Sequence, residues 1–177
     1  TAENSAGKLV KSGDGTLVLG NASNTYTGGT QITGGTLSFD YATRTALGTG
    51  GIEVSQDSTL LYAVNASGGK TTSLFSNNVT GTGTIILDNT GQDETKINNA
   101  VFAGFEGELV LRGNLRFHGE TGDSLASIQA ITVESGTHLY MDNESSAGTP
   151  WNQNFTIAGT GTGTGNDKAG ALRMDNT

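Results

Sequence analysis

Carboxylates are the side chains of this sequence whose spacing could support chemistry. They occur in four close pairs, which are Asp93 with Glu94, Glu106 with Glu108, Glu120 with Asp123, and Asp142 with Glu144. Such pairs can hold Ca²⁺, or act as acid and base in the cleavage of a polysaccharide. Most of these acids, however, fall in segments that are typical of loops, and no basic residue repeatedly accompanies them. We interpret them as a solvated surface.

The remaining polar motifs indicate neither a metal site nor a cofactor site. Residues 162–167 read TGTGND, which partly matches a calcium-binding nonapeptide. That motif needs tandem copies and a large apolar residue two positions after the aspartate, where Ala169 stands. His118 and His138 lack a third ligand at zinc spacing, and no Ser-His-Asp signature is present. We therefore expect no metal, no cofactor and no enzymatic activity.

Aromatic residues on loops or on outward strand positions are the candidate ligand contacts. Tyr41, Tyr140 and Trp151 occupy such positions and could stack on sugar rings. Three other aromatic residues fall on inward strand positions and are expected in the core: Phe39, Phe117 and Phe155.

A second candidate surface is apolar. Val18, Leu61, Ile86 and Val110 each occupy the outward position next to a core leucine or isoleucine. A monomer should cover such a strip or use it as an interface. We therefore name these four residues the outward strip and expect it to support self-association.

Composition narrows the class of protein. The 177 residues include 28 glycines, one proline and no cysteine, and only 15% are charged, well below the usual share. Nine basic against 17 acidic residues give a net charge of −8, which argues against a nucleic-acid partner. No apolar run is long enough to cross a membrane as a helix, so this segment is not expected to insert into one.

Glycines preceding alternating apolar residues recur along the chain. The clearest stretch is residues 7–37, GKLVKSGDGTLVLGNASNTYTGGTQITGGTL, and a weaker copy spans residues 81–111. Glycine permits the positive φ of a sharp corner, and the alternation buries one face of the strand that follows. These phrases predict short strands joined by tight turns.

The spacing of apolar residues predicts how the strands stack. Seven residues at intervals of 20, 23, 25, 24, 30 and 33 are predicted to form one column: Leu17, Leu37, Leu60, Ile85, Leu109, Leu139 and Leu172. We therefore expect residues 1–177 to form one all-β domain, a parallel β-helix of roughly seven to eight irregular rungs about 4.8 Å apart. A β-sandwich is the alternative. Residues 40–48 could form a helical turn or a loop, and residues 123–129 a short helix.

Residues 7–37 closely resemble the passenger-associated repeat of bacterial autotransporters, whose pattern is K-x-G-x-G-T-L-x-L followed by N-T-Y-x-G-G-T-x-I-x-x-G-T-L. The matching residues are Lys11, Gly13, Gly15, Thr16, Leu17, Leu19, Asn24, Thr25, Tyr26, Gly28, Gly29, Thr30, Ile32, Gly35, Thr36 and Leu37. The resemblance implies a right-handed β-helix exported across a Gram-negative outer membrane and exposed on the cell surface. The export barrel would lie elsewhere in a longer parent chain, of which this is an excised piece.

The resemblance also implies a function. The segment would be a stalk or scaffold for adhesion or self-association, with glycans or proteins of host or neighbouring cells, or copies of itself, as partners. The alternative is a carbohydrate-binding or carbohydrate-cleaving β-helix module. That reading is disfavoured because the arginines are scattered in the sequence: Arg44, Arg112, Arg116 and Arg173.

Overall fold

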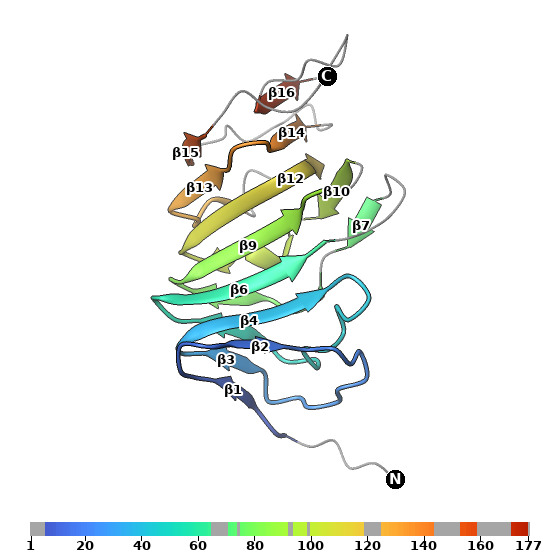
Figure 1. The fold of residues 1–177 in the computed structure, drawn as a ribbon, viewed down its shortest axis with the longest axis vertical. Coiled ribbons are helices and arrows are strands. Elements are labelled where there is room, and N and C mark those ends of the chain that lie inside the picture. The colour runs from blue at the N-terminus through green and yellow to red at the C-terminus, as the bar shows by residue number, and fades with distance from the viewer. Residues whose placement is uncertain are drawn as a thin grey trace.

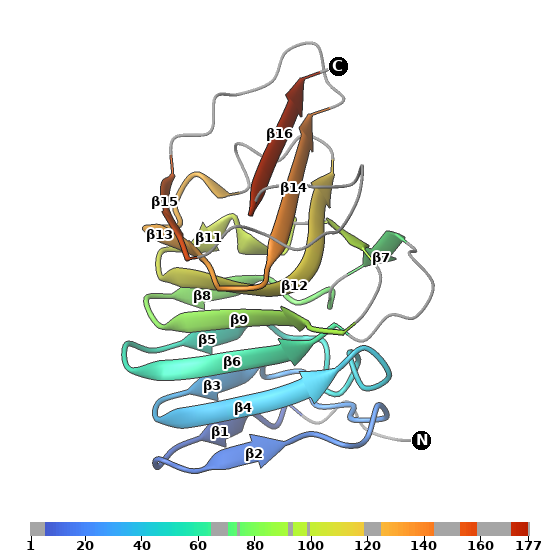
Figure 2. The same ribbon diagram turned by 45° about the horizontal axis from the view of Figure 1, so that its top comes forward.

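The chain winds as a parallel β-solenoid of about five turns (Figure 1). The computed structural model describes residues 6–64, 71–73, 75–91, 94–98, 100–118, 125–143, 153–158 and 171–176. The strands of successive turns lie on one another along the long axis of the molecule, as Figure 2 shows. All recorded strand pairs are parallel, which excludes the alternative of an antiparallel sandwich for this part of the chain.

Three stacks of strands form the walls. The first sheet contains β1 (Leu9–Lys11), β3 (Thr30–Ile32), β5 (Ile52–Val54), β8 (Val79–Gly81) and β11 (Gly104–Phe105), in that order. The second contains β2 (Thr16–Val18), β4 (Gly35–Asp40), β6 (Ser58–Ala63), β9 (Thr84–Asn89), β12 (Glu108–His118), β13 (Ala130–Val133) and β15 (Asn154–Ile157). The third contains β7 (Thr71–Ser73), β10 (Thr95–Asn98), the end of β12, β14 (His138–Asn143) and β16 (Leu172–Asn176).

The first sheet ends at β11, whereas the second continues with β13 and β15. The described residues therefore do not confirm the expected count of roughly seven to eight rungs.

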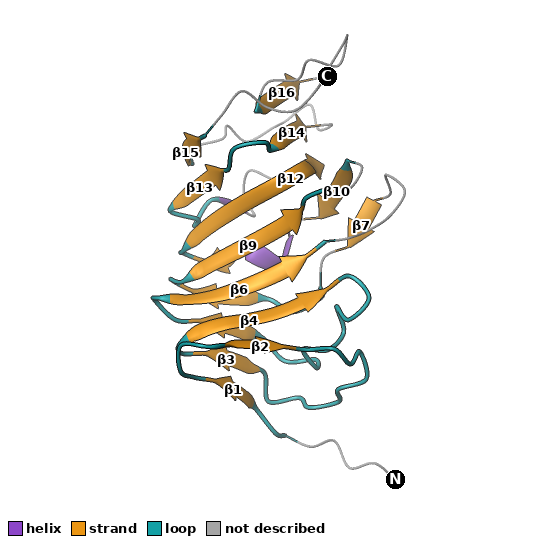
Figure 3. Ribbon diagram, in the orientation of Figure 1, coloured by secondary structure: helices purple, strands orange, loops and turns teal. Residues whose placement is uncertain are grey.

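Strand dominates the described residues (Figure 3). Residues 41–47 form turns and no helix. Within the predicted short helix of residues 123–129, Leu125 has 3₁₀ conformation, residues 126–127 form a turn, and the Ile128 amide donates to the Leu125 carbonyl at 3.0 Å. One 3₁₀ turn, η1 (Ala100–Phe102), was not predicted. The sequence signal for η1 is weak because its residues AVF suit a strand equally well.

The predicted core column is confirmed over its first five residues. Leu17, Leu37, Leu60, Ile85 and Leu109 are successive register partners on β2, β4, β6, β9 and β12. Their side chains belong to a single hydrophobic core or pack against it. Because the register is maintained, the outward neighbours of these residues also form straight rows.

Above Leu109 the predicted column is wrong. The register partners that follow Leu109 are Ile131 and Phe155, at spacings that continue the earlier ones. Leu139 and Leu172 belong to a separate column that starts at Leu115 on the third sheet. The reason is that β12 crosses from the second sheet to the third and supplies an inward residue to each.

A glycine makes this crossing possible. Gly113 has φ +79° and is the register partner of Asn89, the last residue of β9. The fully buried Asn89 side chain donates to the Asn114 carbonyl at 2.6 Å, so successive corners are joined. This corner directs the end of β12 toward β14 and β16.

Lys11, a residue of the repeat pattern, is buried rather than solvated. Its Nζ donates to three backbone carbonyls, those of Ser12 at 3.2 Å, Gly13 at 2.7 Å and Gly34 at 2.8 Å. An ammonium group has three donors, so each can be satisfied here. Lys11 therefore ties the corner of the first turn to the corner of the second.

Tyr62 should make the protein less stable in alkali. Its ring packs in the core between Phe39 and Phe75, at 4.9 and 5.8 Å between ring centroids, and its hydroxyl makes no hydrogen bond to any described residue. Burial raises the pKa of Tyr62 above its usual range. The folded chain thus keeps the phenol proton to higher pH than the unfolded chain does. The free energy of unfolding therefore does not depend on this phenol's ionisation below about pH 10, and it decreases as the pH rises further.

We expect Tyr62→Phe to raise the free energy of unfolding by about 1 kcal/mol at neutral pH and to reduce its alkaline decline. The control is Tyr26→Phe. The Tyr26 hydroxyl forms a hydrogen bond with the Thr30 hydroxyl at 2.8 Å, and loss of that bond should lower the free energy of unfolding. Denaturant unfolding below and above pH 10 measures the free energy of unfolding of both variants. A destabilised Tyr62→Phe variant at neutral pH would mean that the hydroxyl has a partner.

Candidate functional site

The solvent face of the second sheet is built from straight rows of side chains. One row begins with four threonines and continues with an acid: Thr16, Thr36, Thr59, Thr84 and Glu108. In Figure 1 the strands that carry this face lie side by side from β2 to β12. Neighbouring strands are about 4.8 Å apart, so each row repeats a side-chain position at that interval.

The outward strip is the next row on this face. Leu61, Ile86 and Val110 are successive register partners, but Ser38 separates Leu61 from Val18. Val18 is 67% exposed, whereas Val110 is only 8% exposed. The row is therefore apolar and continuous over three strands only, and Val110 adds little open surface.

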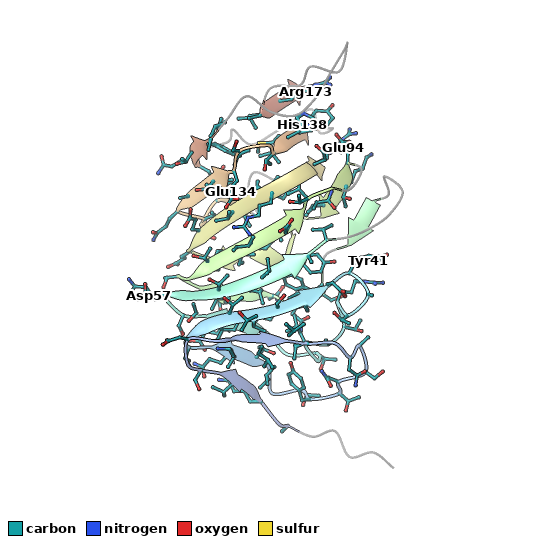
Figure 4. All side chains as sticks on the ribbon, in the orientation of Figure 1. Tyr41, Asp57, Glu94, Glu134, His138 and Arg173 are labelled. Atoms are coloured by element: carbon teal, nitrogen blue, oxygen red, sulfur yellow. The ribbon has the colours of Figure 1, made fainter. Side chains whose placement is uncertain are left out.

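Acids on the third outward row of the second sheet are paired rather than free. Arg112 donates through Nε and Nη2 to the two carboxylate oxygens of Glu134, both at 2.9 Å, and its Nη1 lies 3.9 Å from Asp88. The hydrogen bond to Glu134 is the main reason that the pKa of Arg112 is raised. Figure 4 shows Glu134 beside the upper strands. Since all three side chains are partly exposed, the group contributes only modest stability.

A cationic and aromatic row runs along the third sheet. Arg116, Tyr140 and Arg173 are register partners on β12, β14 and β16. The Arg116 guanidinium lies 4.3 Å from the Tyr140 ring centroid and that of Arg173 lies 4.8 Å from it. Glu94 is 3.7 Å from Arg116 (Figure 4). Because the arginines come from the strands on either side of β14, they cover the ring faces of Tyr140, and a sugar could reach only its edge.

Tyr41 and Tyr140, the two predicted sugar contacts within the described residues, do not lie together. Tyr41 directly follows β4 (Figure 4), whereas Tyr140 lies on β14, in the upper part of the molecule in Figure 1. Arg44 covers the Tyr41 ring at 4.3 Å from its centroid and donates to the Tyr41 carbonyl at 2.9 Å. Trp151 lies outside the described residues. Tyr41 and Tyr140 thus share a different property, a stacked arginine.

Of the four carboxylate pairs, the structure describes both side chains only for Glu106 and Glu108. Glu108 accepts a hydrogen bond from the Thr132 hydroxyl at 2.6 Å, and Glu106 is exposed. Several predicted positions lie outside the described residues or side chains: Asp93, His118, Glu120, Asp123, Asp142, Glu144 and residues 162–167. The described part of the chain contains no group of three or more His, Asp or Glu residues placed to hold a metal ion.

The arginine row was missed because its members look scattered in the sequence. Each of its three residues directly follows an inward leucine, namely Leu115, Leu139 or Leu172. Had Leu115 been recognised as the start of a second column, this constant offset would have placed the three side chains in one row. The signal was therefore present, but the single-column interpretation concealed it.

One comparison with known protein families gives a match, and it covers the first turns of the solenoid. The model of the passenger-associated-transport-repeat family matches residues 9–39, which run from the first residue of β1 to the last but one of β4. No curated protein and no solved structure gives a match to the chain. Among the described residues, none of the helical segments is long and apolar enough to span a membrane.

Proposed function

Starting from residues 9–39 as an autotransporter passenger repeat, we propose that the chain is a stalk or scaffold segment of an autotransporter-like surface protein. It would present surfaces for adhesion or self-association outside a Gram-negative outer membrane. We also propose right-handed winding, seven to eight rungs over the whole chain, and an export barrel elsewhere in the parent protein. The family match and the solenoid both fit a passenger domain.

The observation that carries this proposal is the unbroken register of the second sheet. Each turn places an inward residue on that of the turn below, from Leu17 through Leu109 to Phe155. In such a fold each turn contacts mainly its neighbours, so length can grow without a new core. A turn that has formed also offers the unpaired N–H and C=O groups of its strand edges to the next turn. This suits a protein that projects from a surface and folds as it emerges from a pore.

We propose that the segment is not an enzyme. Supporting this, Asp88 and Glu134 flank Arg112, and Glu108 accepts a hydrogen bond from Thr132, so these acids have structural partners.

Self-association through the outward strip is the testable part of the scaffold proposal. We expect the chain to form larger species as its concentration rises, and more so at high salt, because salt screens the repulsion between copies of net charge −8. Sedimentation velocity over a range of protein and salt concentrations measures this.

The decisive variant carries Leu61→Lys and Ile86→Lys, which should shift association to at least about tenfold higher concentration. Its matched control carries Thr59→Lys and Thr84→Lys, which add equal charge on the same two strands and the same face. A wild-type chain that remains monomeric at high salt, or equal behaviour of the two variants, would refute a role of the strip.

A further inference from the structure

A cleft lies where loops from three turns meet. Its volume is about 440 Å³. The loops follow β2 and β4 and precede β8, and Figure 2 shows the first two stacked at one end of their strands. Its lining includes Asn24, Thr25, Arg44, Thr49, Ser76 and Asn77.

Side-chain hydrogen bonds between turns hold the cleft in shape. The Asn24 amide donates to the Ala46 carbonyl at 2.8 Å, and the Thr45 hydroxyl donates to the Ala22 carbonyl at 2.8 Å. The buried Asn77 amide donates to the carbonyls of Gly48 and Gly50 at 3.1 and 2.6 Å. The walls therefore form together with the solenoid, and a ligand would meet a site that needs little ordering.

Arg44 is the only charged residue of the lining. The Tyr41 carbonyl and ring hold its guanidinium, at 2.9 Å and 4.3 Å respectively. Within the described part of the chain no carboxylate pairs with it, unlike Arg112 and Arg116. The hydroxyls of Thr25, Thr49 and Ser76 likewise make no hydrogen bond to a described residue. The fixed Arg44 guanidinium thus lines the same cleft as several hydroxyl groups that can bond a ligand.

We propose that this cleft binds a carboxylated sugar, such as a uronic acid unit of an acidic polysaccharide. A guanidinium matches a carboxylate through two parallel hydrogen bonds, and hydroxyl and amide groups match the sugar hydroxyls. The volume falls within the range of small-molecule sites and greatly exceeds what a simple inorganic anion needs. Arg44 is the anchor, and Tyr41 is a positioning residue that acts through it. The inference names a ligand class for the adhesive role and rests on the proposed function to that extent.

Trigalacturonic acid is the probe, and its fully methyl-esterified form is the matched neutral ligand. Titration into the ¹⁵N-labelled full chain should shift the backbone amide signals of Thr25, Thr45 and Thr49. We expect the ester to bind at least about tenfold more weakly, because it cannot pair its charge with Arg44. Equal affinity for the two ligands would overturn the proposal, as would equally tight binding of sodium acetate at the same amides.

Variants separate the cleft from the rest of the surface. Arg44→Gln should abolish the shifts, and Arg44→Lys should weaken binding less, since it keeps a charge but not the paired geometry. Ser76→Asp, on an exposed lining residue, should also abolish binding, whereas Asn78→Asp just outside the lining should not. Shifts that survive in Arg44→Gln or Ser76→Asp, or that map to Arg116 and Tyr140, would refute the site. Sedimentation does not involve the sugar, so failure here is distinguishable from failure of the scaffold proposal.

Discussion

Replacing Leu60 with aspartate is expected to abolish cooperative folding of the chain. Leu60 is fully buried on β6 between its register partners Leu37 and Ile85. Removing a buried leucine costs about 2–5 kcal/mol, and burying an unpaired carboxylate adds several more. Domains of this kind are stable by only about 5–15 kcal/mol, so little or no stability should remain. Thermal unfolding monitored by circular dichroism would show a broad change without a transition.

The matched control is Leu61→Asp. Leu61 is the next residue of the same strand, and its side chain is on the solvent face beside Ser38 and Ile86. Side chains alternate between faces with a period of two, so the same substitution one residue later should leave the carboxylate in water. We expect a stability change within about 0.5–1 kcal/mol of the wild type. Similar effects of the two substitutions would mean that the register of β6 is wrong.

The contrast between Leu60 and Leu61 shows what local pattern can predict. Alternation assigns a face to each residue of β2, β4, β6 and β9, so the sheet and its column follow from the sequence. A glycine marks the starts of β2, β4 and β9, whereas β6 begins after Asp57, which has φ +62°. The same reasoning failed above Leu109. Alternation continues along β12 through the corner at Gly113, so alternation alone does not show that the strand changes sheets there.

The candidate sites depended on contacts between turns, which a linear pattern does not specify. The cleft at Arg44 is made by loops whose bonding partners are more than 20 residues apart, such as Asn24 with Ala46 and Asn77 with Gly48. Tyr41 was selected as an exposed ring, but its contact with Arg44 depends on the course of the turn after β4. Loop geometry of this kind follows from packing against the neighbouring turns rather than from residue type.

Replacing Gly113 with alanine should detach the third sheet from the rest of the solenoid. Its φ of +79° favours glycine, and an added Cβ would overlap the carbonyl group of Asn89. The left-handed conformation costs a non-glycine residue about 1–2 kcal/mol, and a clash with backbone in the neighbouring turn adds to it, for a total of about 3 kcal/mol. The second half of β12 would have to leave its position, and β14 and β16 pair beyond it.

Native-state hydrogen exchange can locate this effect. Amides of Leu139 and Met141 should lose protection in Gly113→Ala, while those of Leu37 and Leu60 keep theirs, because lower turns contact the corner only through intervening strands. The control is Gly136→Ala, with φ +80° but no atom within 4 Å of the added Cβ, so it bears the conformational cost alone. If both variants lost the same protection, backbone strain and not the close approach to Asn89 would explain the corner. If Gly113→Ala instead lowered protection equally in all turns, the third sheet would be an inseparable part of one cooperative unit, since its loss would unfold the column below.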